Sequence, residues 1–228
     1  MHKHIRKMFP LIPLNGVPFD VLDTGSLSSL NVISKYRAIF KSVERGCIKW
    51  SHYPEIYDEI FSRVIDKCSN PIKILEIGVQ YGGSLEILRK YFGREAIIFG
   101  IDIDNRCKYL DGEYAHIRIG SAKDNYFLKQ VYEEMGGIDL VIDDGSHKTS
   151  DQISAFKYLF PRLENGGIYI VEDLEHSYFR KSGGIFYLPF TFVNFAKRQV
   201  ETFALQFRTF KKRGTFSKLI NELYSIKF

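Results

Sequence analysis

Short apolar runs alternate with helical patterns along the middle of the chain, from Ile72 onward. The apolar runs are residues 72–77, 96–101, 116–119, 138–142 and 167–171. Helical spacing between them covers residues 84–92, 125–135 and 149–160. Apolar runs of this length separated by helices are typical of a parallel sheet built from strand-helix units. The pattern therefore predicts an α/β fold, with a doubly wound, mostly parallel, Rossmann-like sheet and helices on both faces.

The region before this core has a different pattern. It begins with a stretch punctuated by Pro and Gly, and two helical patterns follow, around 29–45 and 54–67. A loop-like start followed by helices predicts an N-terminal helical cap over residues 1–70, ahead of a core domain at 71–177.

The region after the core, residues 178–228, is expected to be a helical extension. A long amphipathic segment lies near 190–212 and a shorter helix near 216–223. The last residues, 224–228, are typical of a sheet strand, whose expected hairpin partner is missing from the sequence.

The overall composition fits one domain. The chain has 228 residues, of which 45% are apolar, and this is enough for one substantial core. Its three cysteines, Cys47, Cys68 and Cys107, form no CxxC pair of the kind that zinc and redox sites use, and they suit a reducing cytosol. No apolar stretch reaches the ~20 residues that span a bilayer, and the first residues lack the apolar run of a signal peptide. These features favour a cytoplasmic protein without a transmembrane segment.

Positive charge is concentrated after Ser177. That part carries ten Lys or Arg residues against Glu201 and Glu222, although the formal net charge of the chain is only +5. A basic face can meet a phosphate-bearing substrate, nucleic acid or an anionic membrane surface. A solvated helix face explains the same charges equally well.

A glycine-rich turn follows the first apolar run, with Gly78, Gly82 and Gly83 in GxxxGG spacing. In open α/β sheets, ligands bind beyond the carboxyl ends of the strands, and glycines let the backbone lie close to a ligand. Asp102 ends the second apolar run, where a carboxylate can accept both ribose hydroxyls of an adenosine. The turn is thus a candidate adenosine site, and a purely structural turn is the alternative.

The acids around this turn bear on the identity of its ligand. The pyrophosphate of a dinucleotide favours bare helix N–H groups, whereas a cationic amino-acid donor tolerates nearby acids such as Glu76 and Asp143. These charges favour S-adenosylmethionine as the cofactor.

Acidic residues also follow two later apolar runs. Asp144 lies just beyond 138–142, and Glu172 and Asp173 lie beyond 167–171. If these strands are neighbours, the three carboxylates converge, and they cannot all stay ionised at short distance without a cation. Oxygen ligands favour Mg²⁺ or a similar hard ion such as Mn²⁺. The sequence therefore predicts a divalent-metal site.

His147 lies three residues after Asp144, where the next helix begins. An aliphatic hydroxyl is a poor nucleophile until a metal polarises its oxygen or a base removes its proton, and histidine exchanges protons near neutral pH. His147 and Asp144 are therefore the candidate catalytic residues, with His176 as the reserve base. The alternatives are that Asp144 or Ser146 caps the helix and that the acids after 167–171 are solvated.

Two sets of segments resemble known families. The glycine turn, the Asp102 strand end and residues 120–124 resemble the successive motifs of class I S-adenosylmethionine-dependent methyltransferases. Residues 141–147 and 166–173 are similar to the metal-dependent sugar O-methyltransferases that act on macrolide and rhamnosyl antibiotics, and to cephalosporin-hydroxylase-like proteins. The likeness covers about residues 45–177. It includes Lys49, Trp50, His52 and Tyr53, which look like the motif that precedes the domain in that family.

The resemblance implies a role for each candidate residue. It places Asp144, Glu172 and Asp173 at the metal positions and His147 at the base position, and it places Ser121 and its neighbours along the adenine. The candidate donor-site residues are Glu76, Gly78, Gly82, Gly83, Ser84, Asp102, Ser121, Ala122 and Asp143.

The resemblance also implies the acceptor, a hydroxyl of a sugar in a glycan, a glycoside or a nucleotide-linked or lipid-linked precursor. The basic, aromatic tail departs from the antibiotic-tailoring members. Four of its aromatic residues could line a sugar face, although burial is the expected fate of most of them, namely Phe186, Tyr187, Phe190 and Phe192.

Two other functions stay open at this point. One is a nucleic-acid methyltransferase, which the basic tail motivates and the lack of an Asn-Pro-Pro-Tyr-like motif disfavours. The other is a non-catalytic protein that binds S-adenosylmethionine. Relatives of the resembling kind are often multimeric, which implies a homo-oligomer.

Overall fold

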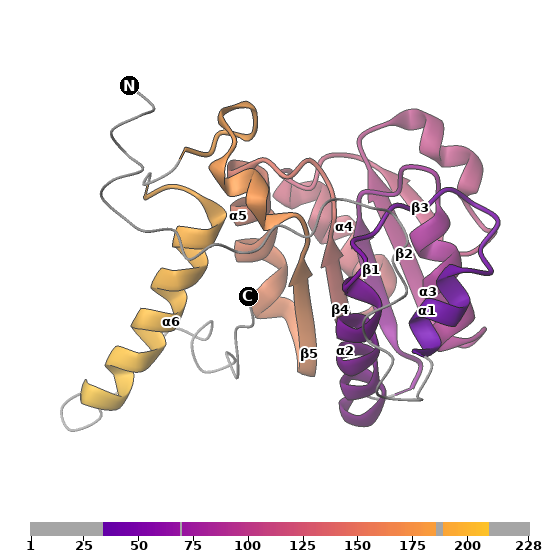
Figure 1. The fold of residues 1–228 in the computed structure, drawn as a ribbon, viewed down its shortest axis with the longest axis horizontal. Helices are drawn as coiled ribbons and strands as arrows, with labels where there is room; N and C mark the ends of the chain where they lie inside the picture. Colours follow the sequence, from indigo (N-terminus) through magenta and orange to yellow (C-terminus); the bar gives the residue numbers. More distant parts are fainter. Residues whose placement is uncertain (1–33, 69, 186–188, 210–228) are drawn as a thin grey trace.

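The computed structural model describes residues 34–68, 70–185 and 189–209. Its centre is a five-stranded sheet in the order β3-β2-β1-β4-β5, and every neighbouring pair is parallel. The strands are β1 (Lys73–Ile77), β2 (Ile97–Asp102), β3 (His116–Ile119), β4 (Ile138–Asp143) and β5 (Leu163–Val171). All five carboxyl ends therefore meet at one edge, which lies at the top of the sheet in Figure 1. The prediction of a doubly wound parallel sheet is confirmed.

Helices cover both faces of this sheet (Figure 1). They are α1 (Lys35–Phe40), α2 (Tyr53–Lys67), α3 (Gly83–Phe92), α4 (Asn125–Met135), α5 (Thr149–Leu159) and α6 (Phe192–Thr209). The described residues also form short 3-10 helices, namely η2 (Asn105–Leu110), η3 (Phe160–Arg162), η4 (Leu174–Tyr178) and η5 (Arg180–Ser182).

The three central apolar runs become strands β1, β2 and β4 because both of their faces are buried. Side chains of a strand alternate between the two faces, so Ile74 packs with α1, α2 and α3, and its neighbour Leu75 packs with α4 and α5. Each side chain is completely buried. At ~25 cal/mol per Å² of apolar surface, burial of this kind supplies most of the free energy that holds the sheet together.

The predicted strands and helices of the core match the structure closely, with two differences. The fifth strand begins at Leu163 rather than near 167, and its pairing with β4 is irregular between Ile138 and Leu140. The predicted helix at 29–45 is wrong at its end, because α1 stops at Phe40. The N–H groups of Glu44 and Arg45 donate instead to the buried carboxylate of Glu86 on α3.

The C-terminal part is described only as far as Thr209. Phe192 and Phe195 at the start of α6 pack on Phe156 of α5, and the rest of α6 projects away from the sheet (Figure 1). Phe192 is therefore a core residue and no part of an open aromatic wall. The predicted helix at 216–223 and strand at 224–228 lie outside the described residues. Within the described ranges, no helix is long and apolar enough to cross a bilayer.

Candidate donor and metal site

The glycine turn between β1 and α3 lies against the turn that follows β4. Gly78 has a φ of +94°, and a Cβ there would come within 2.3 Å of the carbonyl oxygen of Asp144. Only glycine fits a position that combines positive φ with so close a backbone contact. Glycine at position 78 thus lets the turns after β1 and β4 touch. This contact places the predicted donor site beside the predicted metal site.

Asp102 at the end of β2 holds this turn in shape. One carboxylate oxygen accepts the N–H groups of Val79 (2.9 Å) and Gln80 (3.2 Å), and the other accepts the N–H of Asp104 (2.9 Å). Burial alone would raise the pKa of Asp102, but these three N–H groups lower it. Asp102 is thus ionised and adjacent to the turn, as an adenosine site requires.

Glu76, on β1 just before the turn, is the least satisfied acid of the site. It is completely buried, and neither of its carboxylate oxygens meets a donor at hydrogen-bonding geometry within the described residues. Burial raises its pKa to about 8, while Lys49 and the nearby Ser84 hydroxyl oppose the shift. A buried carboxylate without a donor is costly, and a cationic ligand such as an amino-acid ammonium group would satisfy it. The residues therefore fit the donor S-adenosylmethionine.

The other candidate donor residues lie on both sides of this turn. Ser121 accepts the N–H of Lys123 at 3.2 Å in the loop after β3, and Ala122 packs on the α4 side of the core. Asp143 is buried at the end of β4, where the Tyr169 hydroxyl donates to it at 3.2 Å. Burial raises the pKa of Asp143 to about 7, and Tyr169 and the Gly145 N–H oppose the shift.

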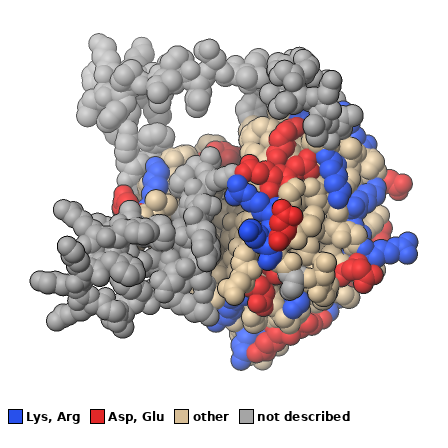
Figure 2. All heavy atoms as spheres, turned by 90° about the horizontal axis from the view of Figure 1, so that it is seen from below, with Lys and Arg blue, Asp and Glu red and all other residues tan. Residues whose placement is uncertain are grey.

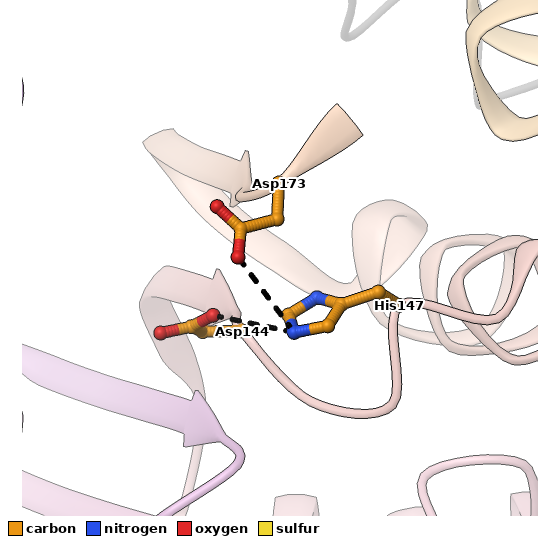
Figure 3. Close-up of side chains that lie close together, drawn as sticks. All are labelled: Asp144, His147 and Asp173. Atoms are coloured by element: carbon orange, nitrogen blue, oxygen red, sulfur yellow. Dashed lines mark ion pairs between the residues drawn. The ribbon is translucent and has the colours of Figure 1, made fainter. Parts of the chain in front are cut away.

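Asp144, His147 and Asp173 converge beyond the ends of β4 and β5 (Figure 3). His147 Nε2 lies 3.9 Å from Asp144 Oδ1 and 3.8 Å from Asp173 Oδ2. His147 and Asp173 both have positive φ, at 51° and 53°. Such backbone strain in non-glycine residues is concentrated at functional sites.

Lys49 joins a second pair of these acids. Its Nζ lies 2.6 Å from Asp144 Oδ2 and 2.6 Å from Glu172 Oε1, and only 3% of the Lys49 side chain is exposed. Burial would lower the pKa of Lys49, but Glu172 and Asp144 raise it well above its usual value. The Tyr57 hydroxyl also donates to Glu172. Glu172 is thus a buried acid with two partners at its Oε1, which excludes the solvated alternative for it.

The segment that carries Lys49 also orients Asp173. Trp50 Nε1 donates to Asp173 Oδ1 at 3.0 Å, and the Tyr53 hydroxyl donates to the same oxygen at 3.4 Å. Asp144 and Asp173 therefore each give one oxygen to this segment and turn the other toward His147. The sequence marked Lys49, Trp50 and Tyr53 only by resemblance, and it missed Tyr57. The spacing of Tyr53, Tyr57 and Phe61 along α2 was the available signal for a buried helix face that carries two hydroxyls.

The separations in this cluster fit a hard divalent ion. The candidate ligand atoms of Asp144, His147 and Asp173 all lie within 4.8 Å of one another. Carboxylate oxygens are the ligands that such an ion prefers, so Asp144 and Asp173 would hold it and His147 Nε2 would lie beside it as a proton acceptor. Glu172 stands beside the cluster, behind Lys49.

Helix capping does not explain these residues. The N-cap of α5 is Lys148, and no side chain caps this helix. The Ser146 hydroxyl accepts the Lys148 N–H at 3.3 Å and donates to Asp151, whereas the oxygens of Asp144 face Lys49 and His147. His176, the reserve base, lies tilted against His147, with ring centroids 4.7 Å apart and ring planes at 43°.

Curated relatives of this chain are sugar O-methyltransferases. The 8-demethyl-8-(2-methoxy-α-L-rhamnosyl)-tetracenomycin-C 3′-O-methyltransferase of Streptomyces olivaceus is 39% identical over 142 residues, which are 59% of this chain and 35% of the relative. The 8-demethyl-8-α-L-rhamnosyl tetracenomycin-C 2′-O-methyltransferase of the same species is 34% identical over 170 residues, 70% of this chain and 44% of the relative. By sequence, this chain is a homologue of these sugar O-methyltransferases.

A solved structure of a methyltransferase has a similar fold. The homologous methyltransferase MycE of the mycinamycin biosynthetic pathway, in complex with Mg and SAH, matches with a TM-score of 0.66 and 26% identity. The match covers 81% of this chain and 48% of MycE. No protein-family model matches the chain. The chain spans less than half the length of the curated relatives it matches.

Proposed function

We propose that this chain carries the donor and metal sites of an S-adenosylmethionine-dependent, divalent-metal-dependent O-methyltransferase that acts on a hydroxyl of a sugar. The observation that carries the proposal is the convergence of Asp144, His147 and Asp173 beside the glycine turn (Figure 3). Its relatives methylate sugar hydroxyls, and MycE is solved with Mg and SAH, the demethylated form of the donor.

The donor is held by the turn and the acids around it. Asp102 faces the ribose, Glu76 faces the ammonium group of the amino-acid part, and Ser121 and Ala122 lie along the adenine. Gly78, Gly82 and Gly83 keep side chains out of the turn, and Ser84 and Asp143 support it. Fixing donor and acceptor in one orientation removes much of the entropic barrier to an in-line displacement.

Asp144 and Asp173 would hold the divalent ion, Mg²⁺ or Mn²⁺, and Glu172 is the third candidate ligand. A divalent ion held there would supply Lewis-acid polarisation of the acceptor hydroxyl. His147 Nε2 receives the proton of that hydroxyl as the oxygen attacks the methyl group of the donor. The oxygens of Asp144 and Asp173 that face this nitrogen stabilise the imidazolium that results.

The mixed charges on the face drawn in Figure 2 do not favour nucleic acid over a sugar. Seen from below, Lys and Arg are interspersed with Asp and Glu over the described atoms (Figure 2). A continuous basic stripe would be expected of a face that binds a phosphate backbone.

Methyl transfer from labelled S-adenosylmethionine to a panel of glycosides and nucleotide sugars tests the proposal. We expect transfer with Mg²⁺ and none in excess chelator, with donor binding retained in both. His147→Asn should lower the turnover ~10²- to 10⁴-fold without loss of donor binding, which is the usual contribution of a general base. A matched control is His116→Asn, at an exposed position at the start of β3 and thus away from the carboxyl edge of the sheet. Full activity in chelator, or equal turnover of the two variants, would reject the proposal.

A further inference from the structure

A cavity of about 390 Å³ opens beside the catalytic cluster. Lys148, Thr149 and Ser150 line it from the start of α5, Lys181 and Ser182 line it from η5, and Phe190 lines it from the segment before α6. This volume lies within the usual range of small-molecule sites.

The cavity is linked to the proposed base through one intervening histidine. Ser182 Oγ, in its wall, lies 2.9 Å from His176 Nδ1, and the His176 ring lies tilted against the His147 ring with centroids 4.7 Å apart. Lys148 follows His147 in the chain. An acceptor whose hydroxyl lies at His147 could thus place another of its groups in the cavity.

The charge on the cavity wall is uncompensated. Lys148 and Lys181 are exposed, and neither forms an ion pair with any acid in the described part of the chain. Lys123, on the other side of the α5 start, contrasts with them, because its ammonium pairs with Asp151 at 3.3 Å. The two unpaired ammonium groups create a positive potential at the mouth of the cavity.

The start of α5 adds donors that lack partners. No side chain caps this helix, whereas Asp124 caps α4 by accepting the N–H groups of Tyr126 and Phe127. Thr149 is buried with 6% of its surface exposed, and its hydroxyl has no hydrogen-bond partner in the described residues. A helix N-terminus without a side-chain cap and an unpaired buried hydroxyl both suit an anion with several oxygens.

We propose that this cavity binds a phosphate or diphosphate group on the sugar acceptor, an inference that rests on the proposed function. Two ammonium groups, helix N–H groups and hydroxyls match the several oxygens of such a group. The ring of Phe190, 69% exposed, offers a face for the sugar. The acceptor is then an activated or carrier-linked sugar rather than a neutral glycoside.

Calorimetric titration with inorganic pyrophosphate, in chelator and at low salt, tests the anion site without any methyl transfer. We expect one binding event that weakens as salt is added. In the double variant Lys148→Gln/Lys181→Gln the affinity should fall about tenfold or more, because charge-assisted hydrogen bonds are lost. Lys129→Gln, an exposed lysine on α4, is the matched control and should bind as the unaltered protein does. No binding, or equal binding by the double variant, would overturn the proposal.

Two further probes distinguish the sources of the phosphate. A nucleoside diphosphate sugar such as UDP-glucose represents a soluble precursor, and farnesyl diphosphate represents a lipid-linked one. Binding of either that depends on both lysines supports the anion site, and the tighter of the two identifies the carrier.

Different experimental outcomes would reject the proposed function and the proposed anion site. Pyrophosphate binding without methyl transfer to any sugar would reject the function and leave the anion site. Methyl transfer to a neutral glycoside, at a rate that the double variant does not change, would support the function and reject the anionic acceptor.

Discussion

The Lys49 ammonium supplies the positive charge that Asp144 and Glu172 share in this structure. Lys49→Met should lower the free energy of unfolding by ~3–5 kcal/mol in metal-free buffer, because it leaves two neighbouring carboxylates unpaired. Added Mg²⁺ should then stabilise the variant more than it stabilises the unaltered protein, since the ion meets acids with no competing cation. Thermal unfolding with and without MgCl₂ measures both effects.

The matched control for this substitution is Lys90→Met. Lys90 also pairs with a buried acid, Glu86, at 2.8 Å, but that pair lies away from the cluster. Its unfolding should respond to Mg²⁺ as that of the unaltered protein does. An equal gain from Mg²⁺ in both variants would contradict the role given to Lys49.

Glu76 makes stability depend on pH. Its pKa in the folded protein is about 8, against an ordinary value of 4.5, so between these values the folded state holds a proton that the unfolded state has released. Stability contributed by the protonated form is therefore lost as pH rises from about 4.5 through about 8. Asp143 adds to the same trend up to about pH 7.

Glu76→Gln should flatten this dependence. The variant cannot ionise at this position, so its unfolding temperature should fall less between pH 6 and pH 9 than that of the unaltered protein. Glu133→Gln, at an exposed position on α4, serves as the control. If Glu76→Gln kept the full slope, the buried carboxylate would not be the group that titrates.

At the scale of elements, the contact between α3 and the segment after α1 depends on one glycine. A Cβ on Gly83 would lie 2.5 Å from the carbonyl oxygen of Gly46 and 2.7 Å from Cys47 Cβ. Gly83→Ala should therefore cost ~1–3 kcal/mol of stability, as overpacking usually does. Gly46→Ala is the control on the other side of the contact, since its Cβ would lie 3.4 Å from Tyr81 Cδ2. Denaturant unfolding measures the stability of both variants. Equal free energies of unfolding would contradict the close packing at Gly83.

The sequence predicted β1, β2 and β4 well because each is buried on both faces and so appears as a continuous apolar run. It overextended the first helix because the periodicity of 29–45 does not show that Glu86, some 40 residues later, takes the N–H groups of Glu44 and Arg45. It placed the start of β5 late because Glu164 and Gly166 interrupt the apolar run. Tertiary partners decide such boundaries, and periodicity does not show them.

At the scale of the whole molecule, parallel topology is what made the site predictable. Once β4 and β5 are parallel neighbours, the residues just beyond them must share one edge, so the sequence could predict that Asp144 and Asp173 lie close together. It could not predict that Lys49 contacts Asp144, because the two residues are 95 positions apart and no sequence pattern specifies a side-chain contact over that separation. The site residues remain predictions, since geometry alone does not show which ligand they bind.

Titration with Mn²⁺, followed by its paramagnetic resonance signal, tests the metal site most directly. We expect one bound ion per chain, with the affinity reduced at least about tenfold by Asp144→Asn and by Asp173→Asn, since each removes one charged ligand. Glu133→Gln should leave the affinity unchanged. Binding that survives both aspartate substitutions, or no binding to the unaltered protein, would contradict the account.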